Sequence, residues 1–98
     1  MMKLMHKSEL IGTIENAYRE GKSMVGDLEL TKAADKYLEM FEYFAGKIDP
    51  YQTPPFPESD LWGWTIEYGD GNILEVIGCP AVRNNGTSIE LYFGKQIN

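Results

Sequence analysis

The feature that most constrains this chain is a proline-rich stretch, "DPYQTPPFPESD", at residues 49–60. Four prolines in this stretch remove backbone donors and disfavour a helix, so it is expected to be an extended connector. The spacing of apolar residues is three or four positions before it and two positions after it. The sequence therefore predicts one domain over residues 1–98, with a helical half at 8–48 and a β half at 61–95.

Two helices are expected in the first half. Across residues 8–22 the apolar side chains fall on one helical face, with Ser8 suited to the N-cap and Gly21 to the stop. Asp27 suits the N-cap of a second helix, which Gly46 ends. The apolar stripe of that second helix comprises Leu30, Ala34, Tyr37, Phe41, Phe44 and Ile48.

Three strands are expected in the second half, at residues 61–68, 73–78 and 88–93. The segments "GDGN" and "NNGT" between them are typical of hairpin turns, because Gly and Asn tolerate positive φ. A meander of this kind has one face to cover, and two helices can cover it. The predicted fold class is α+β, with two N-terminal helices packed on one face of a three-stranded antiparallel β-meander, in the order ααβββ.

Charge and composition disfavour several classes of function. The net charge is −6 and the nine basic residues are scattered, so direct nucleic-acid binding is not expected. No apolar run reaches the length of a membrane span, and no contact with a membrane is expected. The single cysteine, Cys79, requires no oxidising compartment, which favours a cytoplasmic location.

The sequence predicts no catalytic residue, no metal site and no cofactor. The only histidine, His6, is expected to be a solvated residue of a frayed N-terminal tail, and Cys79 a small buried hydrophobe. One His and one Cys cannot supply the usual zinc ligands. A pair of carboxylates among Glu67, Glu75 and Glu90 stays open as an acid–base alternative, since their register cannot be derived from the sequence.

Two features favour binding of another protein. Pre-extended prolines present aromatic residues, and the six acids after residue 49 are accompanied by only two basic residues. The candidate binding residues are Tyr51, Phe56, Glu58, Asp60, Trp62 and Asp70. The expected partner is a protein with a basic or aromatic-lined groove.

The favoured hypothesis is a small non-catalytic inhibitor or antagonist of a larger enzyme, with phage and mobile-element accessory proteins as an analogy. A self-associating structural subunit, such as a homodimer, and a small-ligand-binding domain are the alternatives. Trp62 and Trp64 are expected either to lie together in the core or to form a half-exposed pair at the entry of the first strand.

Overall fold

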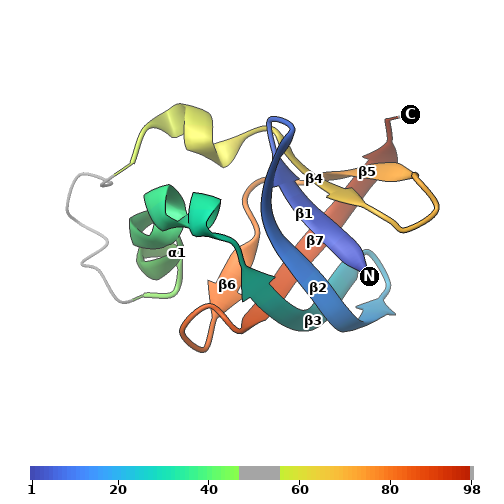
Figure 1. Ribbon diagram of the computed structural model, residues 1–98, viewed down its shortest axis with the longest axis horizontal. Helices are drawn as coiled ribbons and strands as arrows, with labels where there is room; N and C mark the ends of the chain where they lie inside the picture. Colours follow the sequence, from blue (N-terminus) through green and yellow to red (C-terminus); the bar gives the residue numbers. More distant parts are fainter. Residues whose placement is uncertain (47–55, 98) are drawn as a thin grey trace.

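The computed structural model describes residues 1–46 and 56–97, and its main feature is a closed antiparallel β-barrel (Figure 1). Six strands follow one another around the barrel in the order β3-β2-β1-β4-β5-β7, and pairing of β3 with β7 closes it. A seventh short strand, β6, adds to β7. The strands are β1 (Met2–His6), β2 (Glu9–Glu20), β3 (Ser23–Leu30), β4 (Trp64–Glu67), β5 (Ile73–Val76), β6 (Ala81–Arg83) and β7 (Ser88–Gln96).

A helical segment follows β3 and lies beside the barrel (Figure 1). It begins with a 3₁₀ helix, η1 (Lys32–Tyr37), and continues as the α-helix α1 (Leu38–Phe44). Helix α1 packs beside β6 and η1 beside β2. A second 3₁₀ helix, η2 (Glu58–Leu61), leads into β4. Within the described ranges, no helix has the length and apolar character needed to span a membrane.

The predicted α+β fold of two helices on a three-stranded meander is wrong. Most of the first expected helix, residues 8–22, belongs to β2, which pairs with β1 and β3. Lys7 and Ser8 form the turn before it, both with positive φ (49° and 72°). A bulge at residues 16–17 then shifts the register of β2, so its apolar residues do not follow a period of two. Apolar residues in this bulged strand are therefore spaced much as they are on one face of a helix.

The second expected helix exists only in part. Residues 32–44 are helical, and Ala34, Tyr37 and Phe41 of the predicted stripe are buried. The chain before them, up to Leu30, is strand β3 instead. Ile48 and the connector residues up to 55 lie outside the described residues.

Two glycines permit the strands of the barrel to approach one another closely. A Cβ on Gly26 of β3 would lie 2.8 Å from Ile14 Cγ2 and 3.2 Å from the carbonyl oxygen of Glu15. A Cβ on Gly12 of β2 would lie 2.9 Å from the carbonyl oxygen of Glu29. Both glycines are buried, so the tight contact between β2 and β3 depends on the absence of side chains there.

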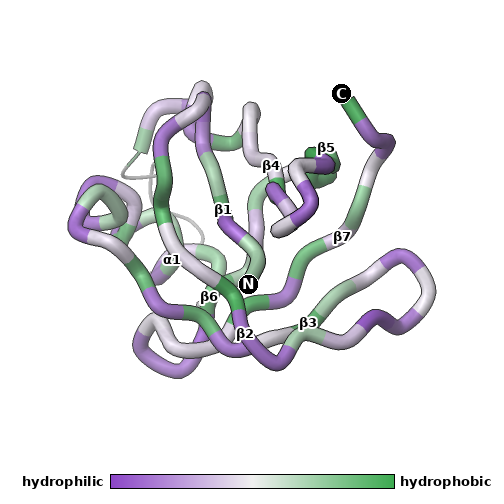
Figure 2. The backbone as a smooth tube through the Cα atoms, turned by 45° about the vertical axis from the view of Figure 1, so that its right-hand side comes forward, coloured by the Kyte–Doolittle hydropathy of each residue, from purple (hydrophilic) through white to green (hydrophobic). Residues whose placement is uncertain are grey.

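Both turns expected in the second half are confirmed, but the strand expected at 61–68 is limited to β4, because η2 continues to Leu61. Strands β4 and β5 pair across "GDGN", and β7 follows the "NNGT" turn. Ile89, Leu91 and Phe93 of β7 are buried in alternation, as the period of two predicts. Strand β6 was not predicted. Hydropathy alternates along β7 (Figure 2), which is typical of a strand with one face toward a core.

Candidate functional site

The two tryptophans separate into one core residue and one surface residue. Trp64 is 1% exposed, and its ring lies 5.3 Å from that of Tyr37 and 5.9 Å from that of Phe41. Trp62 is 59% exposed. Gly63 between them has φ +84°, which a strand does not allow. Strand β4 therefore begins only at Trp64, and Trp62 lies outside it. Neither expected arrangement, both in the core or both half-exposed, is therefore correct.

Trp62 stands between two hollows of the surface. One is bounded by Glu75 and Ile77 of the β5 side, and the other by Phe44 of α1 and Cys79. Leu61, Trp62 and Gly78 line both hollows. We call this region the Trp62 surface, defined by Phe44, Leu61, Trp62, Glu75, Ile77, Cys79 and Ile97.

Apolar side chains on this surface are unusually accessible. Phe44, Ile77 and Ile97 are 47%, 56% and 50% exposed. A third hollow continues the region across Gly63, Thr65 and Ile97 toward β1. Contiguous exposed apolar surface of this kind marks interaction sites more often than single scattered residues do.

A buried histidine holds the backbone of Trp62. His6 is 2% exposed, and its Nε2 lies 2.7 Å from the carbonyl oxygen of Trp62. A carbonyl only accepts, so Nε2 carries the hydrogen and donates it. Nδ1 of the neutral ring then accepts a hydrogen bond from the Tyr37 hydroxyl at 2.6 Å. The expectation of a solvated tail residue is wrong, because β1 inserts between β2 and β4 and carries His6 inward.

The environment of His6 favours its neutral form. Burial is the main cause that lowers its pKa from 6.5. The centroid of its ring lies 4.5 Å from that of Trp64, in a tilted arrangement, and 5.0 Å from that of Tyr37, edge to face, which leaves little room for water. Hydrogen bonding to the Trp62 carbonyl acts in the opposite direction.

Acidic residues accompany the Trp62 surface. Glu58 and the half-buried Asp60 lie on η2, directly before Leu61 and Trp62. Glu75 lines the hollow on the other side of Trp62 and is exposed. The backbone oxygen of Asp60 also accepts the indole hydrogen of Trp64 at 2.7 Å, which anchors the end of η2 to the core.

The structure brings some of the predicted binding residues together and separates others. The ring of half-buried Phe56 lies 5.7 Å from that of Phe44, so Phe56 supports the edge of the Trp62 surface. Asp70 lies in the β4–β5 turn, beyond the far end of β4, where its Oδ1 accepts the backbone N–H of Asn72 at 3.0 Å. Tyr51 lies outside the described residues.

Sequence reasoning missed Ile77, Ile97 and the role of His6. Ile77 had a readable signal, because alternation with the buried Val76 places it on the same outward face as Glu75. The position of Ile97 depends on pairing of β5 with β7, since its N–H bonds the carbonyl of Ile73 at 3.0 Å. His6 contacts residues far along the chain, which no local pattern reveals.

The groups considered for catalysis are dispersed. Glu67 is paired with Lys3 and Ile73, and Glu75 with Thr65, so neither acid is directly opposite another. Glu90 is paired with Val25 and Ala81. Burial raises the pKa of the Cys79 thiol to about 12, which keeps it protonated and unreactive near neutral pH. Over residues 1–46 and 56–97, no group of three His, Cys, Asp or Glu side chains is placed to hold a metal ion.

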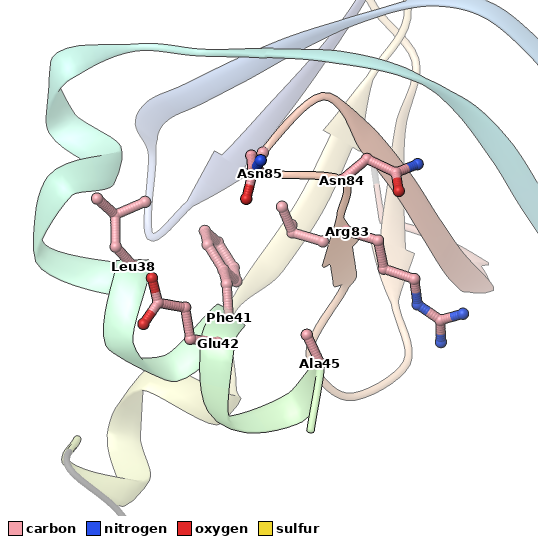
Figure 3. Close-up of a pocket in the computed structure, with 9 residues that line it drawn as sticks. Leu38, Phe41, Glu42, Ala45, Arg83, Asn84 and Asn85 are labelled. Atoms are coloured by element: carbon pink, nitrogen blue, oxygen red, sulfur yellow. The ribbon is translucent and has the colours of Figure 1, made fainter. Parts of the chain in front are cut away.

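A separate hollow of about 370 Å³ lies between α1 and the β6–β7 turn (Figure 3). Its floor contains the buried residues Phe41 and Val82. Glu42 of α1 and Arg83 of β6 come from opposite sides, and the Arg83 side chain extends away from Phe41 (Figure 3). Because its rim carries one acid and one base, this hollow selects no single class of charged ligand.

Comparison with known proteins yields no matching family model, no matching curated protein and no matching solved structure. A functional proposal therefore depends on the geometry and chemistry of the surfaces described above. Of these, the Trp62 surface combines the largest exposed aromatic side chain with a fixed backbone.

Proposed function

We propose that this chain is a small, non-catalytic protein-binding module, and that Trp62 is the anchor it presents to its partner. The observation that carries the proposal is a tryptophan 59% exposed between two hollows, whose backbone carbonyl accepts a hydrogen bond from the buried His6 ring. Tryptophan is enriched among the residues that dominate binding energy, and a fixed backbone reduces the entropy lost on binding.

The charges beside the anchor support a partner of defined chemistry. Glu58, Asp60 and Glu75 lie near Trp62, and the chain as a whole has a net charge of −6. Such a surface complements an apolar or aromatic-lined groove with a basic rim. We infer that the chain inserts Trp62 into a groove of this kind on a larger protein. An inhibitor or antagonist of an enzyme fits this geometry.

Cysteine and basic-residue content bear on the location of the protein and on the class of its partner. A cytoplasmic location is favoured because the single cysteine, Cys79, is free, so the fold needs no oxidising compartment. The scarcity of basic residues disfavours direct contact with nucleic acid. Self-association through the exposed apolar side chains is the alternative, since a second copy could cover the same surface.

The test compares three forms of the protein: wild type, Trp62→Ala and Tyr18→Ala. Tyr18 is a matched control, because it is 56% exposed but lies on β2 outside the Trp62 surface. Each immobilised form is exposed to lysate, and captured proteins are identified and then titrated by calorimetry. We expect Trp62→Ala to weaken binding by more than about 2 kcal/mol, roughly 30-fold, and Tyr18→Ala to change it little.

Equal binding by folded Trp62→Ala would contradict the anchor role. Sedimentation of the wild type at several concentrations tests the alternative, self-association. A concentration-dependent dimer that Trp62→Ala abolishes would identify a second copy as the occupant and overturn the assignment to a different protein.

A further inference from the structure

We propose that the hollow on the β5 side of Trp62 binds an arginine side chain of the partner, whose guanidinium group stacks on the Trp62 indole ring and pairs with the Glu75 carboxylate. The source of this arginine, a partner protein, rests on the proposed function. The guanidinium site itself belongs to the free chain and can be tested without any partner.

The two hollows beside Trp62 differ in charge. The hollow on the β5 side is lined by the Trp62 side and by the exposed acid Glu75. Among the described residues that line the other hollow, from Phe44 to Ala81, none carries a charge. Only the β5-side hollow therefore offers a cation both an aromatic ring and a counter-ion.

Within the described part of the chain, no basic side chain forms an ion pair with Glu75. The ion pair that the structure shows there joins Lys36 to Glu9, on another part of the surface. Lys7 lines the third hollow, and Lys95 follows Gly94 on β7, but neither lysine lines the β5-side hollow. The Glu75 carboxylate is therefore open to a cation that a partner supplies.

The backbone of β7 restricts the Glu75 side chain. The register of β5 and β7 shifts between Leu74 and Val76, so a bulge of β7 lies opposite Glu75. A Cβ on Gly94, in this bulge, would lie 3.2 Å from Glu75 Cβ and 3.4 Å from its Cγ and Cδ. The Glu75 side chain therefore lies along Gly94, where a larger residue would displace it, and this contact limits the rotamer entropy that it loses on binding.

Trp62 and Glu75 lie close enough for one long side chain to contact both. Glu75 is directly opposite Thr65, and Trp62 is three residues before Thr65, a span of at most about 11 Å. Both residues line the same hollow, whose volume is about 450 Å³. A guanidinium group that enters this hollow can therefore contact the indole ring and the carboxylate together.

The chemistry of the hollow suits arginine better than lysine. A guanidinium group is planar, stacks on aromatic rings and forms bidentate hydrogen bonds with a carboxylate. It is also more weakly hydrated than an ammonium group, so it loses less when it leaves water. The exposed side chains of Ile77 and Ile97 line the same hollow and can cover the aliphatic stem of the arginine.

The experiment uses the full chain labelled with 5-fluorotryptophan, which gives one ¹⁹F resonance for Trp62 and one for Trp64. Trp62→Phe assigns them. The probes are Nα-acetyl-arginine amide, its neutral isostere Nα-acetyl-citrulline amide and Nα-acetyl-lysine amide, at constant ionic strength. Each is titrated into wild type, Glu75→Gln and Glu42→Gln. Glu42 is the matched control, because it is exposed and lines the separate hollow beside α1, and both substitutions remove one negative charge.

We expect the arginine probe to shift the Trp62 resonance with half-saturation at about 10–100 mM, while the resonance of the buried Trp64 moves less. The citrulline probe should cause no saturable shift, because it carries no charge. Glu75→Gln should raise the half-saturation concentration for the arginine probe at least about threefold, and Glu42→Gln should leave it unchanged.

An equal response to the citrulline probe, an equal or stronger response to the lysine probe, or equal half-saturation in the two variants would overturn the assignment. So would the absence of a saturable shift up to about 200 mM of the arginine probe. The comparison of arginine with citrulline uses wild-type protein alone, so failure of Glu75→Gln to fold does not obscure the result.

Partner titrations separate the arginine contact from the proposed function. A partner that requires Trp62 but binds Glu75→Gln and Glu42→Gln with equal affinity would refute the arginine contact and leave the anchor role intact. A saturable guanidinium response in a chain whose partner binds equally well after Trp62→Ala would refute the anchor role and leave the guanidinium site intact.

Discussion

Tyr37→Phe should destabilise the protein although it removes only one oxygen atom. The Tyr37 hydroxyl lies 2.6 Å from His6 Nδ1, and both residues are buried. Phenylalanine keeps the ring and its contacts with Phe41 and Trp64, so no large cavity forms. The substitution removes the hydrogen bond to His6 Nδ1 and leaves this buried acceptor without a donor. We expect this to lower the free energy of unfolding by about 1–3 kcal/mol.

Urea unfolding at pH 7.5 measures this difference. With an m-value of about 2 kcal/mol/M, a loss of 2 kcal/mol lowers the midpoint by about 1 M. Tyr18→Phe is the control, because Tyr18 is 56% exposed and its variant should stay within about 0.5 kcal/mol of wild type.

The tautomer of His6 provides a second readout. Ring ¹⁵N shifts should show hydrogen on Nε2 and a lone pair on Nδ1, because the Trp62 carbonyl can only accept. A change below about 0.5 kcal/mol in Tyr37→Phe, or a hydrogen on Nδ1 near neutral pH, would refute the reasoning.

Two further predictions concern stability. Because burial lowers the pKa of His6 in the folded state from 6.5, its contribution is fully present above pH 6.5 and is lost as pH falls toward the folded-state pKa. Urea unfolding between pH 7.5 and 5.5 should show this loss, at most about 1.4 kcal/mol per pH unit, and His6→Gln should lack it; an equal slope in both proteins would exclude His6 as its source. Gly26→Ala should lower the free energy of unfolding by about 1–3 kcal/mol, because its Cβ would lie 2.8 Å from Ile14 Cγ2. Gly69→Ala is the control, since the nearest atom to its Cβ, the Met1 oxygen, is 3.8 Å away, and equal stability of the two variants would contradict the close-approach argument.

The turns of the second half could be predicted because they contain Asn and Gly, the residues that most readily adopt positive φ. Asn85 and Gly86 have the positive φ that the "NNGT" turn requires. The β1–β2 turn requires positive φ as well, but Lys7 and Ser8 are not typical of it. Ser8 therefore suits a helix N-cap in the sequence, and the register shift near Asn16 completes the false helical pattern.

Less of the Trp62 surface than of the second-half hairpins could be predicted from the sequence. Sequence reasoning selected Trp62 as a candidate, and the structure places its side chain on the surface. The difference between Trp62 and Trp64 depends on the φ of Gly63, which composition does not reveal. The bond from His6 joins residues 56 positions apart in the chain, so it follows only from the barrel topology.

Closure of the barrel by β3 and β7 also has a consequence for folding kinetics. Residues paired there, such as Met24 and Leu91, are far apart in sequence, so the closing contact has a high contact order. The β1-β2-β3 meander can form from local contacts, but its inward side chains are buried fully only when β7 docks. A chain in which β7 has not docked leaves its apolar face and its β3 edge open to other chains, so we expect aggregation to begin from that state.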